Sequence, residues 1–221
     1  MGASSSKEPP PPPLVAITPL GLYPQFTTHS QEMALTVLRK FGGDYSAKDA
    51  MTRQQIFSIL SKTISMTNKK EIVDAHGTPV LSLETRAFTL HPKIDGFDGR
   101  PLEPGTGPSP PILKVKFTSN RSANIMFRDR CNPNGVEEDI VLTFETNRRY
   151  TKGTVCNVKG VPIARMMPSK RKAHETLLTI AQGADAALMT AICVILKVRD
   201  VKRRNNGSSG SAAAAGTSGG C

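Results

Sequence analysis

Residues 184–201 read A-D-A-A-L-M-T-A-I-C-V-I-L-K-V-R-D-V, and between residues 186 and 196 only Thr190 is polar. A helix that is apolar on every side has no polar face to turn to water, so the rest of the protein must surround it. The apolar run is also shorter than the roughly 20 residues that cross a bilayer. We therefore predict a buried C-terminal helix with Asp185 as its N-cap. A strand over residues 192–195, three of which are β-branched, is the alternative, and it would leave room for a cavity.

The chain before this helix consists of short strand-like segments separated by turn residues. These segments are residues 33–38, 56–60, 64–66, 71–73, 80–83, 87–90, 112–117, 123–127, 140–144, 154–158, 163–167 and 176–180. The Gly- and Pro-rich residues 96–111 are expected to form a long loop that divides the strands into two groups. Many short strands of this kind indicate an antiparallel sandwich or barrel. Together with the buried helix, they predict a mainly β fold, a barrel closed around its own C-terminal helix.

The two groups of strands contain matching hairpins. Residues 72–80 read I-V-D-A-H-G-T-P-V, and residues 155–163 read V-C-N-V-K-G-V-P-I. In such a turn the Asp or Asn side chain accepts hydrogen bonds from the backbone, and the Gly supplies a positive φ. The Pro that follows is tolerated at the start of a strand. We therefore predict two hairpins of one design, one in each half of the barrel.

The ends of the chain differ in composition from the middle. Residues 1–20 include five consecutive prolines, and residues 203–221 are mostly Gly, Ser and Ala, so both are predicted to be disordered tails around one domain over residues 21–202. The chain has 221 residues and a formal net charge of +11, which favours anionic partners. Its four cysteines and four histidines are scattered, so we predict free thiols, no metal and no cofactor.

Short motifs provide one functional signal, which is at the N-terminus. The first residues, M-G-A-S-S-S, match an N-myristoylation site at Gly2. One myristoyl chain binds a membrane only marginally, and a basic surface would supply the second signal. Motifs of nucleophile elbows, phosphate-binding loops, kinases and zinc proteases are absent from the sequence. We therefore expect a protein that is not an enzyme and is not secreted, located in the cytoplasm or at the inner face of a membrane.

Two stretches resemble the LURP-one-related family: D-A-H-G-T-P-V-L-S-L at residues 74–83, and T-I-A-Q-G-A-D-A-A-L at residues 179–188 with V-I-L at residues 194–196. That family is similar to the tubby C-terminal domain and to phospholipid scramblases. The resemblance implies a closed antiparallel barrel of about twelve strands around a hydrophobic helix, and a role in plant defence. Tubby domains bind phosphoinositides through basic side chains. The calcium-binding segment and cysteine-rich stretch of scramblases have no counterpart here.

These observations predict a non-catalytic barrel that binds anionic phospholipid, with phosphoinositides as the expected ligand. The basic residues proposed to contact the head group are Arg148, Arg149, Lys152, Lys170, Arg171 and Lys172. One alternative is a nucleic-acid-associated regulatory protein, although only Tyr150 places an aromatic ring within a basic cluster. A carrier of a small ligand or lipid is the other alternative, if the barrel interior is open. The oligomeric state is left open by the sequence.

Overall fold

The computed structural model describes residues 11–62, 69–86, 93–99, 110–147, 152–169 and 174–208. These residues form twelve strands, two short 3-10 helices and one α-helix. In chain order the elements are η1 (Pro24–Phe26), β1 (Met33–Arg39), η2 (Phe41–Gly43), β2 (Tyr45–Asp49), β3 (Gln55–Lys62), β4 (Lys69–Asp74), β5 (Pro79–Arg86), β6 (Lys93–Asp98), β7 (Leu113–Phe117), β8 (Ser122–Asp129), β9 (Glu138–Thr146), β10 (Gly153–Cys156), β11 (Pro162–Pro168), β12 (Glu175–Ile180) and α1 (Ala186–Ser208).

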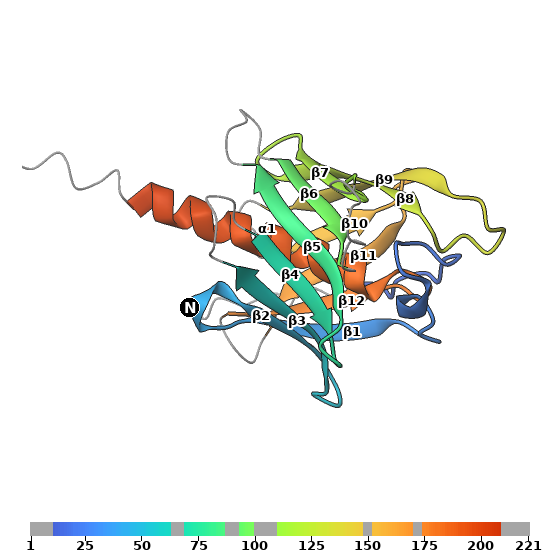
Figure 1. Cartoon of the computed structure of the whole chain (residues 1–221), viewed down its shortest axis with the longest axis horizontal. Helices are drawn as coiled ribbons and strands as arrows, with labels where there is room; N and C mark the ends of the chain where they lie inside the picture. Colours follow the sequence, from blue (N-terminus) through green and yellow to red (C-terminus); the bar gives the residue numbers. More distant parts are fainter. Residues whose placement is uncertain are drawn as a thin grey trace, which may run out of the picture.

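The twelve strands form a closed antiparallel barrel (Figure 1). Each strand pairs with its neighbours in sequence, and β1 closes the ring by pairing with β12 from Met33 opposite Ile180 to Leu38 opposite Glu175. In β7, Leu113, Val115 and Phe117 are buried, whereas the two lysines between them are exposed. This alternation follows from the two-residue period of a strand whose inner face is apolar. The predicted mainly β barrel around a C-terminal helix is confirmed.

Two strands and the extent of one loop differ from the sequence predictions. No strand was predicted at β2 or β6, and β6 includes Gly96, where the long central loop was expected to begin. A Cβ at Gly96 would lie 2.8 Å from Cβ of Leu113 on the adjacent strand, so the glycine allows close pairing there. The predicted strands at residues 64–66 and 87–90 lie outside the described residues.

The matching hairpins β4–β5 and β10–β11 have the predicted common design. Oδ1 of Asp74 accepts hydrogen bonds from the backbone N–H groups two and four residues later, at 2.8 and 2.9 Å. Oδ1 of Asn157 accepts the equivalent pair, both at 3.0 Å. Gly77 and Gly160 follow at φ values of 83° and 76°. Each hairpin also has a register shift just before its turn, so the resemblance extends to the backbone.

Helix α1 begins inside the barrel, and its later turns extend beyond the strands (Figure 1). All residues from 186 to 195 are buried, so the helix is surrounded on every side, and the alternative of a strand at residues 192–195 is wrong. Asp185 is the N-cap, as predicted, because its Oδ1 accepts hydrogen bonds from the N–H groups of Ala187 and Leu188 at 2.8 and 3.1 Å. Across the described residues, no helix has the length and apolarity to span a membrane.

The segment before β1 packs across the end of the barrel where α1 begins. We call residues 11–27 the strap, and this end of the barrel the strap end. Oδ2 of Asp185 accepts hydrogen bonds from the N–H groups of Leu22 and Tyr23, both at 2.9 Å. The Tyr23 hydroxyl donates to the Val80 carbonyl at 2.6 Å. One buried carboxylate therefore caps the helix and also holds the strap. The sequence-based boundary at residue 20 divides the strap, because Leu20 already bonds to Gly183 at 3.0 Å.

Candidate functional site

A small pocket opens between α1 and the barrel wall at the end of the barrel opposite the strap end. We call this end, where α1 leaves the barrel, the helix-exit end. The apolar side chains that line the pocket come from β7, β9, β11 and α1, and they are Phe117, Phe144, Met166, Cys193 and Leu196. Its volume is about 20 Å³, which is room for about one water molecule. The pocket is too small to hold a lipid, so any ligand here must bind at its rim.

Four basic residues from three parts of the chain lie around this pocket. Arg121 is in the turn between β7 and β8, Lys152 directly precedes β10, and Lys197 and Arg199 are on α1. Among the described side chains, no carboxylate lies within ion-pair distance of Arg121, Lys197 or Arg199. We call these four residues the basic rim. Cations from separate elements that converge in this way form a site for an anion.

Arg199 is the most fixed member of the basic rim. Its guanidinium carbon lies 3.7 Å from the centre of the Phe117 ring, and Nη2 donates a hydrogen bond to the Ser119 carbonyl at 3.1 Å. Partial burial lowers the pKa of Arg199 from its ordinary value. A guanidinium has five N–H donors in a planar fork, so Arg199 can donate to an anion while it keeps the bond to Ser119.

The strap end carries a different pattern of charge. Arg128 pairs there with Glu137 at 3.5 Å and with Asp139 at 3.7 Å, and Arg130 pairs with Asp98 at 3.5 Å. These arginines are already matched by carboxylates, so they attract an anion less strongly than the basic rim does. The arginines at the strap end therefore differ from Arg121, Lys197 and Arg199 of the basic rim, which have no such carboxylate partner among the described side chains.

Lys152 is the one predicted head-group residue within the described part of the chain, and the structure places it in the basic rim. The predicted residues Gly2, Arg148, Arg149, Lys170, Arg171 and Lys172 lie outside the described residues. Sequence reasoning missed Arg121, Lys197 and Arg199. Lys197 and Arg199 could have been found, because they are the first cations after the apolar run of the helix. Arg121 is an isolated basic residue in a turn, and the sequence around it does not indicate a binding role.

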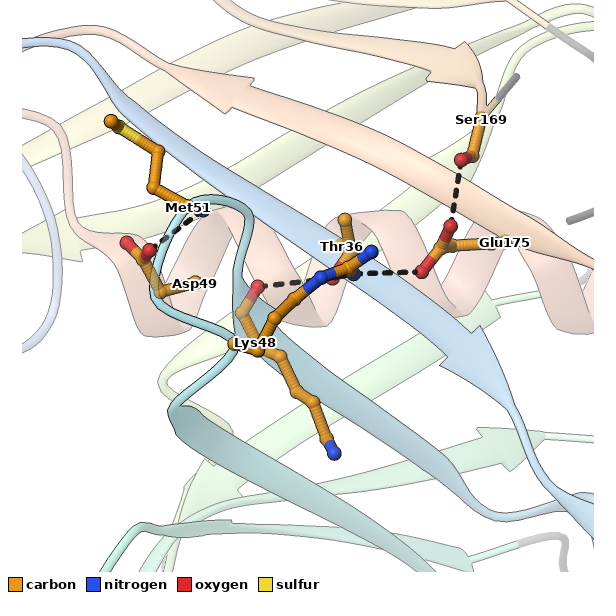
Figure 2. A network of polar contacts seen from close by, with 7 residues as sticks. Thr36, Lys48, Asp49, Met51, Ser169 and Glu175 are labelled. Atoms are coloured by element: carbon orange, nitrogen blue, oxygen red, sulfur yellow. Dashed lines mark hydrogen bonds and ion pairs between the residues drawn. The ribbon is translucent and has the colours of Figure 1, made fainter. Parts of the chain in front are cut away.

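A second polar cluster lies on the outer wall, across β1 (Figure 2). Nη1 of Arg53 lies 3.3 Å from both Oγ1 of Thr36 and Oε1 of Glu175, and Oγ of Ser169 donates to the other carboxylate oxygen of Glu175 at 2.7 Å. The turn after β2 is thereby tied to the start of β12, and Asp49 orders that turn by accepting the N–H of Met51 at 2.9 Å. Because these groups bond to one another, the cluster is best explained as a structural contact that stabilises the pairing of β2, β1 and β12.

Two buried thiols and one buried carboxylate have pKa values above their ordinary range. Burial raises the pKa of both Cys131 and Cys193 to about 12, so neither is a ready nucleophile at neutral pH. Burial also raises the pKa of Asp185 to about 6, and its four backbone donors oppose that shift. In the part of the chain that the structure describes, no three His, Cys, Asp or Glu side chains are grouped to hold a metal ion.

Comparisons with known proteins agree with this fold. The model of the LURP-one-related family matches residues 33–197. A protein of Arabidopsis thaliana, whose structure was solved by X-ray crystallography, is similar at 19% sequence identity and a TM-score of 0.58, over 82% of this chain and 97% of that one. No curated protein gave a significant match. The structural likeness supports the fold alone, whereas the family match includes all twelve strands and the whole buried part of α1. The chain therefore belongs to the LURP-one-related family.

Proposed function

We propose that the helix-exit end binds the head groups of anionic phospholipids, phosphoinositides among them, and that the protein is not an enzyme. The observation that carries this proposal is the basic rim around the pocket. Three of its four cations have no ion pair among the described side chains, and the fourth, Lys152, was predicted as a head-group residue. Phosphate groups are the natural partners of such clusters, because arginine donors match the geometry of phosphate oxygens.

The way α1 fills the barrel opposes the alternative of a carrier. Core side chains of the helix, such as Leu188, Ile192 and Val194, are essentially inaccessible to solvent. The pocket at the helix-exit end is about 20 Å³, far below the roughly 300 Å³ or more of an ordinary ligand site. A surface site for a head group needs no such cavity, so the structure supports binding at the surface.

The beginning of the described chain fits the same orientation toward a membrane. Arg165 on β11 donates a hydrogen bond to the Pro12 carbonyl, and Pro11 lines a groove together with Lys152 and Met167. The strap therefore runs along the wall from the strap end to the helix-exit end. We propose that Gly2, nine residues before Pro11, carries a myristoyl group that adds a hydrophobic contact with the membrane. Intact mass of the native protein tests this modification directly.

Co-sedimentation with vesicles tests the head-group site. Arg121→Glu and Lys159→Glu change the net charge equally, and both residues are exposed in turns, but at opposite ends of the barrel. With about 1 kcal/mol per basic residue near an anionic leaflet, charge reversal at Arg121 should cost ~2 kcal/mol, or about thirtyfold in affinity for phosphatidylcholine vesicles that contain a phosphoinositide. Lys159→Glu should change the affinity less than about threefold.

Two results would contradict the proposal. Equal losses in Arg121→Glu and Lys159→Glu would mean that binding depends on overall charge and not on the basic rim. Failure of the wild-type protein, acylated or not, to bind any anionic vesicle would remove the lipid function itself. Circular dichroism of both variants controls for folding, because neither side chain has an ion pair among the described residues.

A further inference from the structure

Phe41 is the most exposed large apolar residue among those described. Its relative accessibility is 103%, so its side chain has no packing partner. It lies at the tip of the connection between β1 and β2, which we call the Phe41 loop, residues 40–44. A single exposed aromatic ring is common on a protein surface, so the groups around Phe41 must indicate whether a partner covers it.

The charges around Phe41 indicate what that partner is. Arg39 and Lys40 directly precede it and both are exposed, whereas the carboxylate of the loop, Asp44, accepts a hydrogen bond from the Ser61 N–H. The loop follows the end of β1 and precedes β2, so it lies at the helix-exit end, where α1 leaves the barrel (Figure 1). An aromatic ring beside cations is the combination that favours the interface of an anionic membrane, where the ring reaches the acyl boundary and the cations contact head groups.

The Phe41 loop is also held in a fixed shape. Oδ1 of Asp44 accepts a hydrogen bond from the Ser61 N–H at 2.7 Å, and Lys70 donates to the Gly43 carbonyl at 2.9 Å. Gly42 and Gly43 have φ values of 80° and 91°, a conformation that other residues rarely adopt. Because the loop is already ordered, membrane contact would not carry the entropic cost of folding it.

Met51 provides a contrast, because it lies at the opposite end of β2 from the Phe41 loop. It lies in the turn after β2 and is also highly exposed, at 89%. Its turn is built on the carboxylate of Asp49, which accepts hydrogen bonds from three groups in the turn. The two exposed side chains differ in their place on the barrel, because the turn after β2 lies at the strap end, whereas the Phe41 loop lies at the helix-exit end with the basic rim.

We infer that the Phe41 loop inserts into the interface of an anionic membrane and anchors the helix-exit end there. This inference rests on the proposed binding of anionic phospholipid, and it adds a hydrophobic contact to the electrostatic one. The basic rim supplies charge attraction, whereas Phe41 supplies contact with the acyl boundary. The side of the barrel that faces the membrane is then set by Phe41 and the basic rim together.

Tryptophan fluorescence tests the insertion, because the natural sequence contains no tryptophan. Phe41→Trp should give blue-shifted emission with vesicles of phosphatidylcholine and phosphatidylserine, and quenching when the phosphatidylcholine has brominated acyl chains. Met51→Trp is the matched control and should show neither change. Phe41→Ala should weaken vesicle affinity about tenfold, because a buried phenyl ring is lost, with circular dichroism unchanged.

Each outcome separates this inference from the proposed function. If Phe41→Trp sediments with the anionic vesicles but its emission is unchanged, the insertion is refuted and the head-group site stands. The insertion is also refuted if Met51→Trp shows an equal shift, or if Phe41→Ala binds as tightly as the wild type. If the wild type and all variants fail to sediment with anionic vesicles, the proposed function and the insertion both fail.

Discussion

Gly183 lies where the strap meets the start of α1, and its replacement by alanine is a sharp test of that junction. Its φ is 87°, and a Cβ built on it would lie 2.2 Å from the carbonyl oxygen of Ile17. Two hydrogen bonds hold the strap here, from Ile17 N–H to Gln182 and from Leu20 N–H to Gly183, both at 3.0 Å. Gly160 is the matched control, because its φ is 76° and no atom lies within 4 Å of the added Cβ.

The expected magnitudes differ because only one of the two substitutions creates a clash. A left-handed conformation costs an L-residue about 1–2 kcal/mol, and both alanine variants carry that cost. In Gly183→Ala the strap must also move away, which removes two backbone hydrogen bonds of about 1 kcal/mol each. We therefore expect Gly160→Ala to lower the free energy of unfolding by about 1–2 kcal/mol and Gly183→Ala by about 3–4 kcal/mol.

Urea unfolding followed by circular dichroism measures both variants, with the difference taken from the midpoints at a common slope. Hydrogen exchange provides a local readout at the strap residues Leu22 and Tyr23, whose backbone amides donate to Asp185. These two amides should exchange faster in Gly183→Ala and not in Gly160→Ala. If the two variants unfold within about 0.5 kcal/mol of each other, the strap contributes nothing at Gly183, and the reasoning is refuted.

Three further predictions concern the core and the wall. Leu188→Asp buries an unpaired charge and should abolish folding. Leu60→Asp is the control, because Leu60 lies on the outer wall, is 40% exposed and should tolerate the change. A folded Leu188→Asp protein would mean that the helix lies elsewhere. Because the pKa of Asp185 rises from 3.8 to about 6 on folding, its contribution to stability is greatest below pH 3.8 and falls by up to ~3 kcal/mol as the pH rises through 6. Asp185→Asn should remove this dependence. Urea titrations between pH 4 and 7 measure the free energy of unfolding of both proteins, and a wild-type-minus-variant difference that stays constant with pH would contradict the pKa shift. Arg53→Ala and Glu175→Gln should couple by about 1 kcal/mol in a double-mutant cycle, and zero coupling would show that the 3.3 Å contact is not stabilising.

Periodic and local signals in the sequence predicted the parts of the fold that depend on few distant contacts. The apolar run from residue 186 to 196 predicted the buried helix, and Asp185 predicted its N-cap. The hairpin turns at Asp74 and Asn157 were predictable because their side chains bond only to nearby backbone groups. Strands β2 and β6 were missed because Y-S-A-K-D and K-I-D-G-F-D are polar for strands, and pairing with both neighbours stabilises them.

The sequence by itself determined that this protein has an apolar C-terminal helix, many short strands, two related hairpins and a large positive charge. Only the tertiary structure decided which of these cations converge on one pocket and which strands close the barrel. Arg121 and Arg199 are far apart in the chain and become neighbours through the order of the strands. The second role of Asp185, holding Leu22 and Tyr23, depends on a contact across more than half of the chain. Local patterns are set by bonds between near neighbours, whereas a binding surface is set by packing that joins distant segments.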